Sequence, residues 1–169
     1  MKKWMILTAM GALALWGAEQ ARAEESGSRF GGGVNYWTTI DDIDVDNIDE
    51  NGLSYYVSYQ YRGDLLGLEA DVELMPDSYG DDVLAPQAYL LVGGDIYAAA
   101  GVGVMYIDDE FADDPFYALR AGLDLELLPH INLDVYATYR FNPDVEIGDA
   151  VDAIDTDTLF LGAAVRLGL

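Results

Sequence analysis

The segment TLFLGAAVRLGL, residues 158–169, indicates the fold because its residues alternate in character. Its odd-numbered positions, from Leu159 to Leu169, are all apolar, whereas the even-numbered positions are mostly small and include one charge, Arg166. Successive side chains of a β-strand point to opposite faces. The segment is therefore predicted to be a strand with one apolar face and one mixed face.

The same alternation recurs in seven segments that precede this one. The predicted strands span residues 28–37, 52–61, 65–75, 83–93, 96–107, 116–127, 131–141 and 158–169. Eight such segments of about ten residues each are typical of a small, all-β, antiparallel transmembrane barrel. After residue 23, no stretch approaches the roughly 18 consecutive apolar residues that indicate a transmembrane helix.

The first 23 residues have the features of a secretory signal peptide. Lys2 and Lys3 form a positive N-terminal region, residues 4–16 form a short apolar core, and Ala21-Arg22-Ala23 fits an A-x-A cleavage site. We therefore predict a cleaved signal over residues 1–23 and a single barrel domain over residues 24–169. The chain has no cysteine, so this domain must be stable without disulfides.

The domain after the signal is strongly acidic. Of the 8 basic and 31 acidic residues of the chain, Lys2, Lys3, Arg22 and Glu19 lie in the signal, which leaves 5 basic and 30 acidic residues and a net charge of −25. Binding of nucleic acid requires a basic surface, so nucleic acid is excluded as a partner. A basic docking patch for anionic lipid headgroups is excluded for the same reason.

The connections between the predicted strands alternate in length. The long connections are residues 38–51, 76–82, 108–115 and 142–157, and the short ones are 62–64, 94–95 and 128–130. Short periplasmic turns on one side and four long extracellular loops on the other are expected of an up-and-down barrel in an outer membrane. The long connections also hold most of the acidic residues, so we predict four acidic extracellular loops.

The alternation alone leaves open which face of the sheet lines the barrel. A soluble barrel of the lipocalin kind keeps its apolar face inside, whereas a membrane barrel turns that face to lipid. The mixed face carries the arginines, several carboxylates and many glycines and alanines, which favours the membrane barrel, because charges can pair in a narrow lumen and small residues let eight strands close. The predicted lumen network of ion pairs consists of Arg29, Glu69, Asp71, Glu73, Arg120, Asp124, Glu126, Asp134, Arg140 and Arg166.

Aromatic residues lie near the ends of the predicted strands. Those near the long connections are Tyr36, Trp37, Tyr55, Tyr106, Phe116, Tyr117, Tyr139 and Phe141. Amphipathic rings favour the membrane–water interface, so we predict that these residues form an interfacial girdle.

This architecture resembles the small eight-stranded outer-membrane barrels of the outer-membrane protein A and protein X kind. The resemblance covers residues 24–169 and rests on the signal, the eight alternating strands, the order of long and short connections and the amphipathic last strand. It implies an integral protein of the outer membrane. The chain departs from the resemblance in ending with Leu169, where such barrels usually end in Phe or Trp, the residue that the assembly machinery reads.

The sequence does not indicate an enzyme or a cofactor. His130 lies in a predicted periplasmic turn, whereas the strand serines Ser54 and Ser58 lie in the second predicted strand, Ser54 near its opposite end, so no serine–histidine pair is expected. The spacing of Asp42, Asp44 and Asp46 is similar to that of a calcium loop, but the pattern fails where Gly and Glu are required. We therefore expect at most a weak association of divalent cations with loop carboxylates. The candidate residues are Asp42, Asp44, Asp46, Asp108 and Asp109.

Three functions remain open from the sequence. The favoured one is a non-enzymatic outer-membrane protein with a structural or surface role, in which ion pairs fill the lumen, since eight strands leave room for side chains and little else. The second is a narrow cation-preferring pore or a channel for small hydrophobic ligands. The third is a soluble periplasmic binding barrel. For the favoured function we expect a monomer whose partner is outer-membrane lipid.

Overall fold

The computed structural model describes residues 27–40, 51–78, 81–107, 110–112, 114–141 and 157–169. These residues form ten strands in one antiparallel sheet. The strands are β1 (Gly27–Thr39), β2 (Asn51–Arg62), β3 (Leu66–Ser78), β4 (Asp81–Gly93), β5 (Ile96–Gly103), β6 (Tyr106–Ile107), β7 (Glu110–Phe111), β8 (Phe116–Leu128), β9 (Ile131–Phe141) and β10 (Thr158–Gly168). Among the described residues, no helix is long and apolar enough to cross a membrane.

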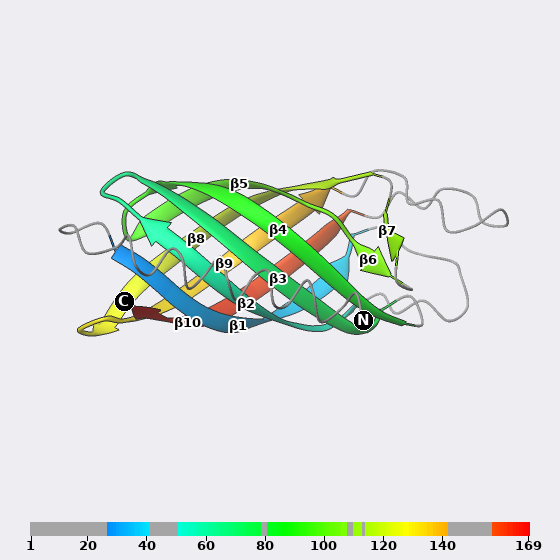
Figure 1. Cartoon of the computed structure of the whole chain (residues 1–169), viewed down its shortest axis with the longest axis horizontal. Coiled ribbons are helices and arrows are strands. Elements are labelled where there is room, and N and C mark those ends of the chain that lie inside the picture. Colours follow the sequence, from blue (N-terminus) through cyan, green and yellow to red (C-terminus); the bar gives the residue numbers. More distant parts are fainter. Residues whose placement is uncertain (1–26, 41–50, 79–80, 108–109, 113, 142–156) are drawn as a thin grey trace, which may run out of the picture.

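The eight long strands close into an up-and-down barrel. Each pairs with its neighbour in the chain, and the first and last strands pair from Arg29 opposite Gly168 to Thr39 opposite Thr158. The strands run obliquely around a common axis (Figure 1). The predicted fold class, an eight-stranded antiparallel barrel, is therefore confirmed.

The two ends of the barrel differ. The short turns at residues 63–65, 94–95 and 129–130 lie at one end, together with the start of β1 and the end of β10. We call this the turn end and the opposite end the loop end. The β4–β5 turn requires a glycine, because Gly93 has a φ of 123° and a Cβ there would meet the backbone of Tyr97 at 2.9 Å.

The predicted connection 76–82 is wrong, because both strands extend into it. Strand β3 runs to Ser78 and β4 begins at Asp81, and these two residues are paired. The register shifts between Met75 and Ser78, around Pro76, which has no amide hydrogen for the ladder. The strand therefore continues through a bulge and forms a hairpin where the sequence suggested a long loop.

The predicted strand 96–107 is interrupted at residues 104–105. Pro86 of the neighbouring β4 has no N–H to donate there, although the Val104 amide donates to the Pro86 carbonyl at 3.1 Å. Tyr106 then pairs with Leu84 and, across a small hairpin, with Phe111. The predicted loop 108–115 therefore contains the short strand β7.

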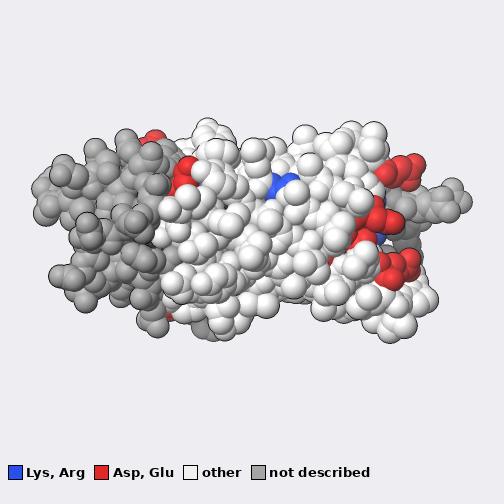
Figure 2. All heavy atoms as spheres, turned by 180° about the vertical axis from the view of Figure 1, so that it is seen from behind, with Lys and Arg blue, Asp and Glu red and all other residues white. Residues whose placement is uncertain are grey.

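The apolar face of the sheet points outward. In β2, Leu53, Tyr55 and Val57 are each about half exposed, with fractions of 50–52%, whereas Ser54 and Ser58 are buried. The middle of the barrel surface is almost free of charge, and acidic atoms gather at the turn end (Figure 2), where Asp64, Asp95 and Glu126 are exposed. The alternative of a soluble barrel with an apolar lumen is therefore wrong.

Candidate functional site: a filled lumen

An apolar cluster occupies the lumen at the loop end. We call it the loop-end cluster, and it consists of Trp37, Met75, Val83, Ala85, Met105, Phe116 and Phe160. All of its members are buried, and Val83 and Ala85 have no exposed surface. Ile107 and Ala112, in the irregular connection between β5 and β8, are partly buried and pack against it. Hydrophobic packing therefore closes this end of the described barrel.

Arg140 lies at the base of the loop-end cluster. Its guanidinium carbon is 4.2 Å from the ring centres of both Phe116 and Phe160, so the cation is placed between two aromatic faces. Its Nη2 donates to Glu73 Oε2 at 2.5 Å. Glu73 also accepts hydrogen bonds from Asn35 at 2.7 Å and from Ser54 at 2.5 Å. The charge is therefore both stacked and paired.

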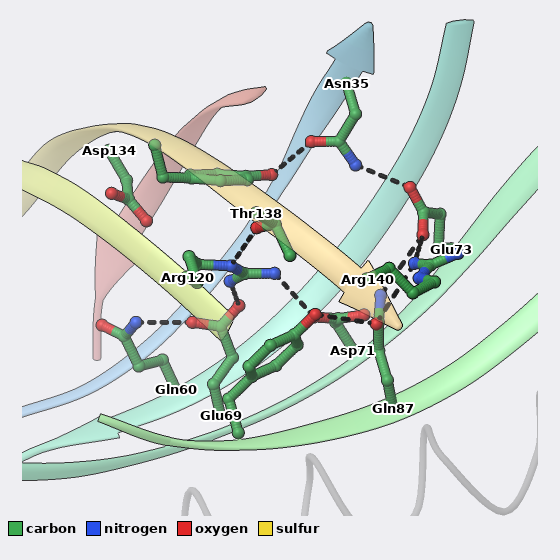
Figure 3. A network of polar contacts seen from close by, with 12 residues as sticks. Asn35, Gln60, Glu69, Asp71, Glu73, Gln87, Arg120, Asp134, Thr138 and Arg140 are labelled. Carbon is green, nitrogen blue, oxygen red and sulfur yellow. Dashed lines mark hydrogen bonds and ion pairs between the residues drawn. The ribbon is translucent and has the colours of Figure 1, made fainter. Parts of the chain in front are cut away.

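Arg120 occupies the middle of the lumen in a second sandwich. Its guanidinium carbon is 4.0 Å from the ring centre of Tyr89 and 4.4 Å from that of Tyr136. Nη1 donates to Glu69 at 2.9 Å and Nε donates to the Thr138 hydroxyl at 3.0 Å (Figure 3). These contacts join β8 to β3, β4 and β9 across the barrel.

Arg166 binds two carboxylates next to this layer. Its Nη2 donates to Glu69 Oε2 at 3.0 Å, and its Nη1 donates to Asp134 Oδ2. Tyr97 donates to Asp134 at 2.9 Å, and Gln60 donates to Glu69 at 2.7 Å. Arg166, Asp134 and Glu69 are buried, as a charge inside a barrel can be only if it is paired.

Asp124 gathers the charges at the turn end. It accepts hydrogen bonds from Arg29 Nη1 and, at 3.0 Å, from Asn132 Nδ2. Arg62 Nη2 lies 3.8 Å from the same carboxylate and donates to the Gly94 carbonyl at 2.5 Å. The Arg29 side chain is 21% exposed, so this end of the polar interior reaches solvent.

A glycine lies directly opposite six of the buried aromatic rings. The register pairs are Gly33–Tyr56, Gly52–Trp37, Gly101–Tyr89, Gly103–Phe116, Gly122–Tyr97 and Gly162–Tyr136. A Cβ on Gly122 would lie 2.6 Å from Tyr97 Cζ, and one on Gly52 would lie 2.8 Å from Trp37 Cζ2. Each ring therefore lies flat over its neighbouring strand, in space that any other residue would fill.

Nine of the ten residues predicted for the lumen network lie together in the barrel. The contacts above include all of these except Asp71, whose Oδ2 is 3.8 Å from Arg120 Nη2. Glu126 is the exception to the prediction, because it is exposed at the turn end. The β8–β9 register shifts between Glu126 and Leu128, so strict alternation fails there.

Sequence reasoning missed Arg62 and the lumen tyrosines. The sequence places Arg62 at the edge of the mixed face and in the connection 62–64, outside the predicted network, but in the structure it is the last residue of β2 and faces inward like Ser58 and Gln60. Four lumen tyrosines also occupy the alternate strand positions that face inward, namely Tyr56, Tyr89, Tyr97 and Tyr136. A glycine lies opposite each of them in the strand register, and this is the signal that could have found them.

Three members of the predicted aromatic girdle are inside the protein. Trp37 and Phe116 have inward parity and belong to the loop-end cluster. Tyr106 is covered by Phe111, whose ring centre is 4.8 Å away. Tyr36, Tyr55, Tyr117 and Phe141 are exposed, as a girdle requires.

The candidate cation contacts cannot be placed in the same way. Asp42, Asp44, Asp46, Asp108 and Asp109 lie outside the described residues, as does the predicted signal over residues 1–23. Within the described ranges, no three His, Cys, Asp or Glu residues are grouped as metal ligands. His130 is exposed at the β8–β9 turn, with a φ of 67°.

The outer wall has a shallow groove of about 630 Å³ over β2 to β5. Outward-facing alanines form much of its floor, namely Ala70, Ala88 and Ala100, between larger neighbours such as Tyr59 and Leu90. It belongs to the apolar belt and not to the lumen.

Solved structures with the same barrel identify the fold. The crystal structure of Neisserial surface protein A matches 86% of this chain and 100% of its own, with a TM-score of 0.66 and 17% identity. The chain has the fold of the small outer-membrane β-barrels. OprG of Pseudomonas aeruginosa matches 85% of this chain and 97% of its own, with a TM-score of 0.51 and 14% identity. A designed transmembrane β-barrel matches 86% and 98%, with a TM-score of 0.50 and 15% identity.

The sequence itself gives no closer assignment. No protein-family model matches it, and no curated protein does. The outward apolar belt and the fold together describe a membrane barrel protein.

Proposed function

We propose that this protein is a non-catalytic, integral outer-membrane barrel that is closed to solutes and acts as an anchor for the segments at its loop end. The barrel holds the chain in the lipid through its apolar belt. The residues that join the strands at the loop end then provide the contact with the surroundings of the cell. The proposal places the turn end toward the periplasm.

The observation that carries the proposal is that two arginines in the lumen each lie between a pair of aromatic rings. Arg140 lies between Phe116 and Phe160, and Arg120 lies between Tyr89 and Tyr136. An eight-stranded barrel encloses a space that side chains alone can fill. With the loop-end cluster above them, we expect these sandwiches to block any continuous aqueous path for a hydrated solute.

The surface role is supported by two further observations. Neisserial surface protein A, which shares the fold over its whole length, is by its name a surface protein. The exposed apolar residues of β2 and β10, such as Val57, Leu161 and Val165, are each about half exposed and need lipid around them.

The absence of catalysis is part of the same proposal. His130 is exposed at the turn end, whereas Ser54 is buried and donates its hydroxyl proton to Glu73 near the loop end. A serine nucleophile needs a histidine within hydrogen-bond reach, and these two side chains are at opposite ends of the barrel.

Planar-bilayer recording tests the closed lumen. The folded wild-type barrel is expected to give no steady current. A Phe116→Ala/Arg140→Ala/Phe160→Ala variant removes the Arg140 sandwich and is the matched control, because a widened lumen should give a current that the recording can detect. A steady current through the wild-type protein would overturn the proposal. Resistance to carbonate extraction and a heat-shifted band on a gel are expected for the inserted barrel.

A narrow cation-preferring pore is the second candidate. The exposed carboxylates Asp64, Asp95 and Glu126 at the turn end favour it, because they would concentrate cations at that mouth. The same recording distinguishes the two functions. A wild-type current that carries potassium in preference to chloride would support the pore.

A further inference from the structure

One wall of the lumen carries several buried polar atoms without partners. Among the described residues, both carboxylate oxygens of Asp71, the Ser58 hydroxyl and the Gln60 carbonyl oxygen are buried and have no hydrogen-bond partner. The Tyr56 hydroxyl is in the same condition. Their side chains are between 1% and 5% exposed. A buried polar atom that stays unsatisfied costs about 1–3 kcal/mol, so a group of them points to a ligand that forms hydrogen bonds.

These atoms form a row along the β2–β3 wall. Tyr56, Ser58 and Gln60 alternate along β2 and share the inward face, and Asp71 of β3 is directly opposite Ser58. Inward side chains two residues apart on a strand are about 6.6–6.8 Å apart. The row is therefore too long for a single ion, but its spacing suits small molecules placed between successive groups.

The two neighbouring donor side chains form their hydrogen bonds with acceptors other than Asp71. Arg120 Nη2 is 3.8 Å from Asp71, while the Nη1 and Nε of the same side chain donate to Glu69 and Thr138. Gln87, which is opposite Asp71 on β4, directs its amide group to Glu73 at 3.4 Å. Figure 3 shows Asp71 between Arg120 and Gln87, with the shorter contacts of Arg120 directed to Glu69 and Thr138.

The charge of the lumen decides which ligand fits. Five arginines face five buried carboxylates among the described residues, so the interior is neutral when all of them are ionised. The arginines are Arg29, Arg62, Arg120, Arg140 and Arg166, and the carboxylates are Glu69, Asp71, Glu73, Asp124 and Asp134. A bound metal cation, or a proton on Asp71, would leave an uncompensated positive charge in a low-dielectric space.

We propose that a file of ordered water molecules occupies the β2–β3 side of the lumen, held by Asp71, Ser58 and Gln60. Water supplies the missing donors without adding charge, and a buried water usually forms about three hydrogen bonds. The file is entered from the turn end, where Arg29 is 21% exposed, and it stops beneath the loop-end cluster. The lumen is therefore hydrated on one side below the loop-end cluster.

Water–protein cross-relaxation measured by NMR on the isotope-labelled barrel in detergent micelles tests this proposal. Water cross-peaks are expected at the amide protons of Ser58 and Asp71 and at the side-chain amide of Gln60. None is expected at Val83 and Leu91, which are inward-facing and fully buried. The carboxyl carbon of Asp71 is expected to have the chemical shift of an ionised group.

The chain offers a matched pair of variants for the same spectra. Ser54 and Ser58 are both buried on the inward face of β2, but only the Ser54 hydroxyl has a protein acceptor. Ser58→Ala is expected to abolish the water cross-peak at position 58 and weaken the one at Gln60, whereas Ser54→Ala is expected to leave both in place.

Three results with the wild-type barrel, and one with the variants, would each overturn the proposal. The first is the absence of water cross-peaks at Ser58, Gln60 and Asp71 in the wild-type barrel. The second is a carboxyl shift of Asp71 typical of a protonated acid. The third is a shift that changes when sodium is replaced by N-methyl-D-glucamine, since this would identify a cation site. Equal loss of the water cross-peaks in the Ser54→Ala and Ser58→Ala variants would also contradict it.

Discussion

The two halves of the lumen are enclosed by the same strands but filled in opposite ways. At the loop end, Trp37, Phe116 and Phe160 pack with aliphatic and methionine side chains. Toward the turn end, Arg166 and Asp134 belong to a set of charges that pair across the barrel. The strand positions that face inward therefore hold side chains that fit a narrow space, whether these are polar or apolar.

Arg140 marks the boundary between the halves. Its planar group presents its faces to the rings of Phe116 and Phe160 and its edge to Glu73. A guanidinium can satisfy both environments because it stacks on rings and forms hydrogen bonds in its own plane. The two halves should therefore respond differently to substitution, as the following changes would show.

Removal of the most deeply buried arginine should have the largest effect. Arg166→Met leaves Glu69 and Asp134 without their common partner, and breaking a buried pair costs about 3–5 kcal/mol. The free energy of unfolding, measured by urea titration of the barrel in lipid vesicles, should fall by that amount. A fall of less than about 1 kcal/mol would mean that the turn-end half is not stabilised by this pairing.

Opening the loop-end cluster should have a similar or slightly smaller effect. Phe160→Ala removes a buried ring and one face of the Arg140 sandwich, and such truncations cost about 3 kcal/mol or more. Trp37, the single tryptophan after residue 23, lies in the same cluster, so its fluorescence should shift to longer wavelength. Arg166→Met should leave that emission unchanged, and a shift in both variants would contradict the separation of the two halves.

Filling a glycine opposite a lumen ring should have a smaller effect. In Gly122→Ala the new Cβ would be 2.6 Å from Tyr97 Cζ, and overpacking of this kind costs about 1–3 kcal/mol. The displaced ring would also lose its hydrogen bond to Asp134. Gly94→Ala is the control, because no atom lies within 4 Å of the position of its Cβ. Equal unfolding free energies for the two variants would show that the rings adjust freely.

The weakest effect is expected at the mouth of the turn end. Arg29 is partly exposed, so Arg29→Gln should lower the free energy of unfolding by about 1 kcal/mol or less. Raising the ionic strength from about 0.1 to 1 M shortens the screening length from about 10 to 3 Å, so this difference should shrink. The loss caused by Arg166→Met should persist at high salt, and its disappearance would indicate solvent access to the buried pair.

The strands and their orientation could be predicted from the sequence because both follow from alternation. The long runs of alternating residues in β2 and β10 fix which residues face lipid, since a shift by one residue would reverse every side chain. The errors occurred where alternation is locally broken. Pro76 and Pro86 each remove a ladder donor. A bulge lies at Pro76 in β3 and an interruption lies beside Pro86 at residues 104–105, and the pattern showed neither.

The lumen was predictable in kind but not in detail. Parity assigns Arg120, Arg140 and Arg166 to the inward face, but which carboxylate each one contacts depends on the stagger of the strands around the barrel. Trp37 and Phe116 were misassigned because interfacial preference was given more weight than parity. Asp71 has the arginine neighbour that was predicted, but its Oδ2 lies 3.8 Å from Arg120 Nη2, whereas Glu69 Oε1 lies 2.9 Å from Arg120 Nη1.

The glycine–aromatic pairs have a consequence for how the barrel is assembled. If β8 slipped by two residues against β5, each face would stay correct, but Tyr97 would lie opposite Arg120 or Asp124 in place of Gly122. The ring would then collide with a large side chain on its own face. A strand in the wrong register is therefore destabilised before β1 and β10 pair. The glycine–aromatic pairs thus select the correct register while the barrel inserts.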